Sequence, residues 1–115
     1  MVKSLTLNQT WSRCIAMWRW IVEQLKIRPE ASVDSLKREW LRVHDPVRDL
    51  SGNCYFCAWV CTHKNEDNTC VNCPGVRIDP QFSCESTAYH YIYNPAAFLR
   101  KLEQLNKKRL NRKGN

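Results

Sequence analysis

Residues 54–84 constrain the fold most, because six of the seven cysteines fall within these 31 residues. The segment holds two C-x2-C pairs separated by twelve residues: Cys54/Cys57 and Cys70/Cys73. A C-x2-C turn directs two thiolates at one point, and two such turns supply the four ligands of a tetrahedral zinc ion. Gly75, shortly after the second pair, offers the open backbone of a tight turn. The pattern predicts a closed, structural zinc site.

Three further residues of this segment are candidate ligands: Cys84, Cys61 and His63. Cys84 ranks first, because the loop 76–83 gives it reach. Cys61 is explained equally well as a small buried hydrophobic residue, which free cysteines usually are. The six cysteines also resemble the module of DNA-binding proteins in which six cysteines hold two zinc ions, although the three-residue interval between Cys57 and Cys61 is shorter than usual there.

Other uses of the cysteines fit less well. Seven is an odd number for a disulfide framework, and the first ten residues lack the continuous apolar stretch of a secretory signal. A thioredoxin-like pair comes singly near a βαβ pattern, and none is visible. An iron–sulfur cluster stays open as an alternative to zinc, since there are enough thiolates for it. Free thiols without a targeting segment indicate a reducing cytoplasm.

The length of 115 residues predicts one domain, residues 1–115. A hydrophobic content of 43%, with five tryptophans, suffices for a compact core, and nothing approaches the roughly eighteen apolar residues of a membrane span. We expect a mainly α fold of about three helices around a central zinc-knuckle segment, with little or no β structure. Two helices are expected in residues 1–50, the zinc-binding segment in 51–93, and a basic helix and tail in 94–115.

The first predicted helix has an apolar stripe at spacings of four, three, four and three residues: Trp11, Ile15, Trp18, Val22 and Leu25. Thr6 and Gln9 fit a capping box at its start, and Pro29 marks a point by which it has ended. Cys14 widens the buried face and is expected to be a core cysteine rather than a metal ligand.

A second helix is predicted to follow, capped by Ser32 or Asp34 and ending by about His44 because Pro46 biases its predecessor away from the helical region. Its apolar face is expected to consist of Val33, Leu36, Trp40 and Val43. Four charged residues are expected on its outer side: Lys37, Arg38, Glu39 and Arg42.

Residues 89–93 alternate tyrosine with other residues, so an extended segment would place three tyrosines on one face. Such a face stacks unpaired bases in single-strand binders. The interpretation that we favour is that it packs over the zinc turns or the helices, because a small metal-binding domain needs aromatic cover.

The clearest helix start is Asn94, a good N-cap, followed by Pro95, a good first helical residue. The apolar stripe of this helix is predicted to be Phe98, Leu102 and Leu105, with Leu99 beside them. On a helical wheel, Arg100 and Lys107 lie opposite the stripe, and Lys101 and Lys108 flank it.

Positive charge is concentrated in this last helix and the tail. Residues 1–99 hold eleven Lys/Arg and ten Asp/Glu, whereas residues 100–115 hold seven and one, so +6 of the formal +7 lies there. Such a cluster neutralises phosphates and favours nucleic-acid binding without sequence specificity, although a solvated helix end has the same pattern. The predicted contact residues are Arg100, Lys101, Lys107, Lys108, Arg109, Arg112 and Lys113.

The chain resembles small cysteine-rich proteins of bacteriophages. The features that carry the resemblance are the two cysteine pairs, the second followed by proline, the later cysteine, the tyrosine-rich segment and the charged helix. The resemblance covers mainly residues 54–105 and implies a zinc-binding protein in an infected bacterial cytoplasm. Cys61, the loop 62–69 and the long basic tail depart from the shorter members of that group.

These features predict a non-enzymatic, nucleic-acid-associated accessory or regulatory protein with structural zinc. The alternative is a protein-binding inhibitor or adaptor, such as a phage factor that blocks a host or defence enzyme. An HNH nuclease is excluded by length, because twelve residues between the cysteine pairs leave no room for its catalytic ββα unit. A membrane-surface role is disfavoured, because the few apolar residues of the basic helix are needed for the core.

The zinc interpretation predicts that Cys57→Ser or Cys73→Ser unfolds the central segment, because structural zinc binding carries on the order of 10 kcal/mol. Native mass spectrometry counts the metal: one ion supports the paired-turn site, and two support the binuclear alternative. Absence of zinc, or normal thermal stability of both variants, would reject these ligands.

Overall fold

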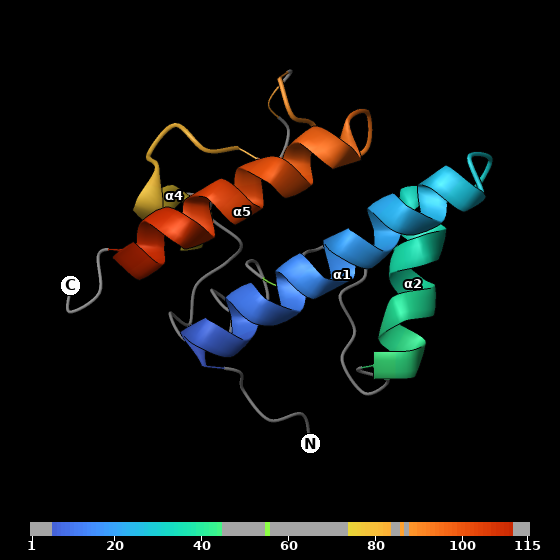
Figure 1. The fold of residues 1–115 in the computed structure, drawn as a ribbon, viewed down its shortest axis with the longest axis horizontal. Coiled ribbons are helices and arrows are strands. Elements are labelled where there is room, and N and C mark those ends of the chain that lie inside the picture. Colours follow the sequence, from blue (N-terminus) through green and yellow to red (C-terminus); the bar gives the residue numbers. More distant parts are fainter. Residues whose placement is uncertain (1–5, 45–54, 56–73, 84–85, 87, 112–115) are drawn as a thin grey trace.

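The computed structural model describes residues 6–44, 55, 74–83, 86 and 88–111. Across these ranges the chain is mainly helical and contains no strand, as predicted. The helices are α1 (Leu7–Ile27), α2 (Val33–His44), α4 (Pro74–Ile78) and α5 (Pro95–Asn111). Figure 1 shows α1 and α5 side by side, with α2 folded back along one end of α1 and α4 beside α5.

The start and the buried face of α1 follow the sequence pattern. The Gln9 backbone N–H donates to Thr6 Oγ1 at 3.1 Å, and the Thr6 N–H donates to Gln9 Oε1 at 2.9 Å, which confirms the capping box. Trp11, Ile15 and Trp18 are buried, and Cys14 is buried beside them as expected. Val22 and Leu25, predicted to continue the stripe, are only half-buried, because the buried face continues through Ile21 instead. The helix ends at Ile27, two residues before Pro29.

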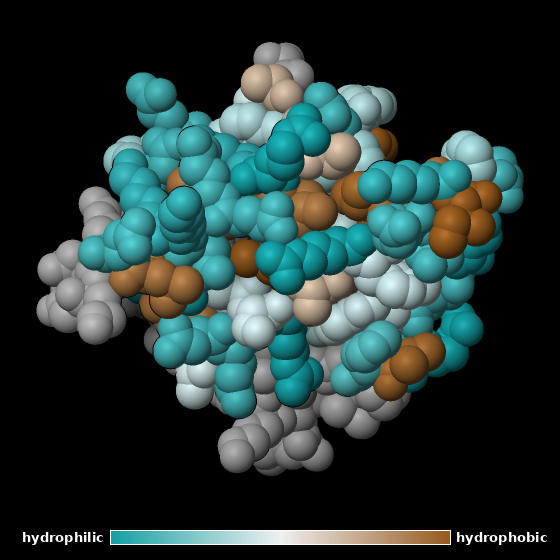
Figure 2. Space-filling model, viewed as in Figure 1, coloured by the Kyte–Doolittle hydropathy of each residue, from teal (hydrophilic) through white to brown (hydrophobic). Residues whose placement is uncertain are grey.

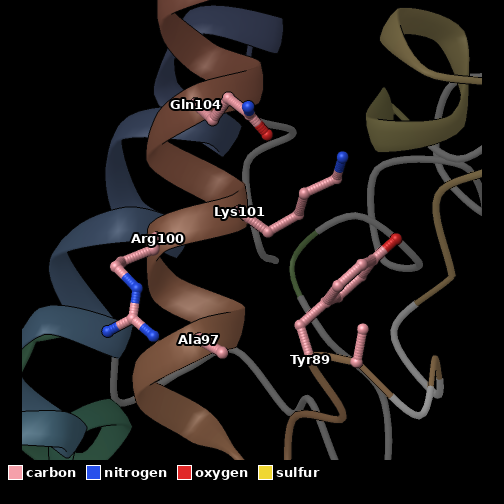
Figure 3. A pocket seen from close by; sticks show the side chains of 6 residues that line it. Tyr89, Ala97, Arg100, Lys101 and Gln104 are labelled. Carbon is pink, nitrogen blue, oxygen red and sulfur yellow. The ribbon is translucent and has the colours of Figure 1, made fainter.

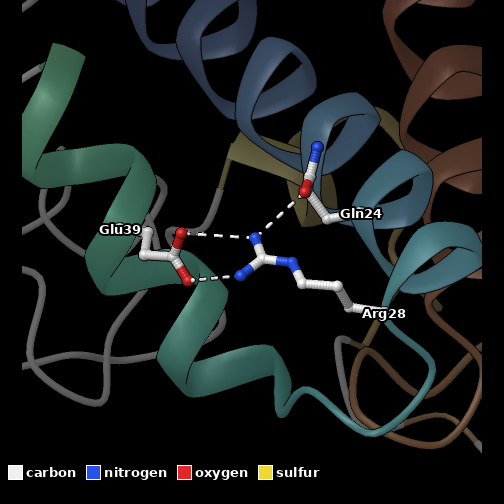
Figure 4. A network of polar contacts seen from close by, with 3 residues as sticks. All are labelled: Gln24, Arg28 and Glu39. Carbon is white, nitrogen blue, oxygen red and sulfur yellow. Dashed lines mark hydrogen bonds and ion pairs between the residues drawn. The ribbon is translucent and has the colours of Figure 1, made fainter.

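A polar clamp joins α1 to α2 across the short connection between them. The Arg28 guanidinium donates to both carboxylate oxygens of Glu39, at 3.2 and 3.3 Å, and to Gln24 Oε1 at 2.9 Å (Figure 4). Both charged side chains are more than a third exposed, so the pair contributes at most about 1 kcal/mol and chiefly fixes the geometry. Ser32, rather than Asp34, caps α2: the Ser35 N–H donates to Ser32 Oγ at 3.1 Å.

Two expectations for α2 were wrong. Val43 is 73% exposed, because the whole last turn, residues 42–44, is exposed and the apolar face ends one turn earlier than expected. Lys37, expected on the outer side, is only 7% exposed. Its Nζ lies 5.8 Å from the ring centroid of Trp18 and 5.4 Å from that of Tyr91, so the ammonium makes cation–π contacts with two aromatic rings.

Helix α5 begins as predicted. Asn94 Oδ1 accepts from the Ala97 N–H at 3.4 Å, and Pro95 is the first helical residue. The predicted stripe is confirmed, since the buried residues of α5 are Phe98, Leu102 and Leu105. This stripe faces α1, where the rings of Phe98 and Trp18 meet edge to face with 5.0 Å between their centroids.

Residues 89–93 form turns rather than an extended segment, so the three tyrosines do not share a face. The chain turns because the Asn94 N–H donates to the His90 carbonyl at 2.8 Å and the Ile92 N–H to His90 Nδ1 at 3.2 Å. Tyr89 and Tyr91 pack against the core, whereas Tyr93 is 82% exposed. The expected aromatic cover is therefore supplied by two tyrosines of the three.

The expected loop 76–83 is partly helical, because α4 runs from Pro74 to Ile78. Gly75 lies inside this helix and its place there is set by close packing: a Cβ at this position would lie 2.7 Å from Cδ2 and Cε2 of Phe82. Phe82 is buried, parallel to Tyr89 at 6.0 Å between centroids and 6.1 Å from Phe98. Helix α4 therefore packs through Gly75 against Phe82, which in turn packs against Phe98 of α5.

Gly75→Ala is expected to lower the free energy of unfolding by about 1–3 kcal/mol, because the enclosed Phe82 ring has little room to move away from the new methyl group. Urea unfolding of the variant measures this. In a Phe82→Leu background the same substitution is expected to be less harmful, and equal penalties in the two backgrounds would show that the Phe82 contact is not the cause.

Candidate nucleic-acid interface

The structure describes five of the seven predicted contact residues, and all five belong to α5: Arg100, Lys101, Lys107, Lys108 and Arg109. Arg112 and Lys113 lie outside the described residues. The helix carries a single acidic residue, Glu103, and this carboxylate is taken by Arg19 of α1 at 2.8 Å. Among the described residues, the positive charge of α5 is therefore balanced only at Lys101, by Asp79.

Three cations of α5 are exposed: Arg100 and Lys107 on the outer side, and Lys108 on the flank that also carries Lys101. Within the described part of the chain none of the three forms an ion pair. Figure 2, seen from the side of α1 and α5, shows hydrophilic side chains over most of this face and hydrophobic ones only in separate patches. The face is suited to a charged partner.

Lys101 differs from these three because it binds within the protein. Its Nζ lies 2.9 Å from Asp79 Oδ2 and 5.5 Å from the ring centroid of Tyr89. A shallow pocket of about 290 Å³ opens beside them, and Figure 3 shows Lys101 extending towards the Tyr89 side while Arg100 points away. The Tyr89 ring is thus engaged by Lys101 and by Phe82. The exposed Tyr93 is the better placed of these two tyrosines for stacking on an unpaired base.

Arg109 is oriented by neutral groups. It donates to Asn8 Oδ1 at 2.7 Å and to Asn106 Oδ1 at 2.8 and 3.2 Å, and its guanidinium carbon lies 5.3 Å from the Trp11 ring centroid. Arg109 is among the contact residues predicted from the sequence, whereas neither asparagine is. Asn106 lies one helical turn before Arg109, but Asn8 is 101 residues away in the sequence, and no local signal links the two.

The predicted metal site lies outside the described residues: Cys54, Cys57, Cys70 and Cys73, and the substitutes Cys84, Cys61 and His63. Of the seven cysteines only Cys14 is described, and it is buried in α1. Among the described residues no three His, Cys, Asp or Glu side chains are grouped closely enough to hold a metal ion. Zinc binding stays a prediction from the sequence.

The chain matches no protein-family profile, no curated protein and no solved structure. None of the helices in the described ranges is both long enough and apolar enough to cross a membrane.

The ion pair between Asp79 and Lys101 predicts a pH dependence. The hydrogen bond from Lys101, supported by the Gln81 N–H, lowers the pKa of Asp79 below its ordinary value of 3.8. A lowered folded-state pKa stabilises the protein above pH 3.8, and this contribution is lost as the pH falls through the folded-state value. Asp79→Asn should therefore lower Tm at pH 7, and the difference from wild type should shrink below pH 3.8. A constant difference across that range would contradict an ionic contribution.

Proposed function

We propose that this protein is a non-enzymatic binding protein that associates with nucleic acid through phosphate contacts along α5. The observation that carries the proposal is the separation of the α5 cations: Arg100, Lys107 and Lys108 are exposed and have no carboxylate partner among the described residues, whereas Lys101 is neutralised by Asp79. Exposed, unpaired cations on one helix release counterions when they meet a phosphate backbone.

The number of cations sets the strength expected of this contact. Arg112 and Lys113 follow α5 in the sequence and add two charges to those on the helix. The three exposed cations of α5 and these two make about five phosphate contacts, which would give binding that is weak at high salt and independent of base sequence, because phosphates carry no sequence information.

The zinc-stabilised core belongs to the same proposal and is supported by the cysteine spacing alone. Paired C-x2-C turns would stabilise the segment between α2 and α4. An accessory or regulatory role in a phage-infected bacterial cytoplasm is supported only by the resemblance of residues 54–105. No reaction is proposed, because the described residues do not group a nucleophile, a base and an orienting residue on α5.

The test replaces Lys107 and Lys108 by glutamine and measures binding to short DNA and RNA strands at several salt concentrations. Loss of two phosphate contacts should lower the slope of log K against log salt by about 1.8 for duplex DNA and about 1.4 for single strands. The control is Lys26→Gln with Arg38→Gln, which removes the same charge from exposed positions on α1 and α2. Equal effects of the two double variants would contradict an interface on α5.

The protein-binding alternative is favoured by one feature, the adjacent Ile92 and Tyr93, which are 42% and 82% exposed just before α5. An aromatic residue next to an aliphatic one is a common anchor at protein interfaces. Binding to one host protein that survives truncation of residues 106–115 but is lost in Tyr93→Ala would favour this alternative.

A further inference from the structure

A groove between α1 and α5 differs from the outer side of α5 in how its cation is held. The groove has a volume of about 420 Å³, and its lining includes Asn8, Ser12, Arg19, Asn106 and Arg109. Among the described residues no carboxylate lines it. Arg19 reaches it from α1 while pairing with Glu103, so Arg109 is the groove cation without a carboxylate partner among the described residues.

The Arg109 guanidinium is pre-oriented without being neutralised. Three of its five N–H groups donate to amide oxygens of Asn8 and Asn106, and two N–H groups remain. Partial burial of this cation lowers its pKa below the ordinary value of an arginine, and an arginine keeps its charge nonetheless. A cation that is partly desolvated, held by uncharged partners and stacked on Trp11 is arranged to receive an anion from outside.

The other polar groups of the groove fit the same ligand. Because Asn8 Oδ1 and Asn106 Oδ1 accept from Arg109, the two amide NH₂ groups stay as donors, and the Ser12 hydroxyl is a further donor. A set of donors around a guanidinium fork matches the tetrahedral, multiply accepting phosphate group. A carboxylate is smaller and planar and would leave donors unpaired.

We propose that this groove binds one backbone phosphate of the nucleic acid, with Arg109 as its anchor and Asn8 and Asn106 as positioning residues. This inference rests on the proposed function, and it adds a fixed point of attachment to the exposed cations of α5. Successive residues of an α-helix point about 100° apart, so Lys107 and Lys108 project from other sides of α5 than Arg109, and the groove is a separate point of contact with the nucleic acid. Because Arg109 is already ordered, its contact loses less side-chain entropy than a contact from a free lysine.

The test compares Arg109→Lys, Arg109→Gln and Lys107→Gln by fluorescence anisotropy with short oligonucleotides at several salt concentrations. Arg109→Lys keeps the charge and loses the fork, so the affinity should fall roughly tenfold while the salt slope stays unchanged. Arg109→Gln should lower the affinity at least as much as Arg109→Lys and should also reduce the slope of log K against log salt by about one phosphate contact. Lys107→Gln should reduce the slope by the same amount with a smaller loss of affinity. Arg109→Lys that binds like wild type, or Arg109→Gln that matches Lys107→Gln, would overturn the proposal.

Asn8→Ala guards against a loss of folding, because it leaves Arg109 and its contact with Trp11 in place. It should weaken oligonucleotide binding several-fold at an unchanged slope and with Tm close to wild type. Unaltered affinity of Asn8→Ala would contradict pre-orientation as the source of binding. If Lys107→Gln with Lys108→Gln behaves like its control, the proposed function itself fails, which is a separate result.

Inorganic phosphate distinguishes the two sources of a phosphate group. In NMR spectra of the 15N-labelled protein, the Arg109 Nε–H signal should move on addition of an oligonucleotide and move little with millimolar inorganic phosphate. Saturable binding of inorganic phosphate that an oligonucleotide does not displace would assign the groove to a free phosphate and overturn the backbone assignment.

Discussion

The packing of Trp18 is the contact on which the arrangement of the helices depends. The side chain is 1% exposed and meets three separate parts of the chain. The ring centroid of Trp18 lies 5.0 Å from that of Phe98 in α5, 6.2 Å from that of Tyr91 in the preceding turn, and 5.8 Å from the Lys37 ammonium of α2. A large aromatic side chain thus gives α1 enough buried surface to hold two helices and a turn.

This arrangement decides where the charges of α5 lie. With Phe98, Leu102 and Leu105 facing α1, Arg100 and Lys107 fall on the outer side of the helix, Lys101 and Lys108 fall on one flank, and Arg109, four residues after Leu105, continues the side that faces α1. Where α5 meets other elements its cations acquire partners: Asp79 beside Lys101, and two asparagine amides around Arg109. The outer side meets nothing described, so Lys107 stays exposed. A uniform basic helix in sequence becomes three chemically different surfaces.

The features that local chemistry controls were predictable from sequence. The capping box of Thr6, the Asn94 cap and the buried stripe of α5 depend on residues within two turns of one another. Features set by distant neighbours were not. Lys37 is buried because rings from α1 and residue 91 accept its charge, and Asn8 meets Arg109 across 101 residues. The cysteine pairs lie outside the described residues, so the zinc site stays a prediction from the sequence.

The amide clamp around Arg109 has a consequence for how folding and binding are linked. A partly desolvated cation without a counter-anion destabilises the free protein. A carboxylate in place of the Asn8 or Asn106 amide would neutralise Arg109 and remove this cost. An arriving anion would relieve this, so the bound form would be the more stable one by mass action. A substitution that relieves the free protein by adding a permanent negative charge would also close the groove to its ligand. Stability and affinity are therefore opposed at these two asparagines.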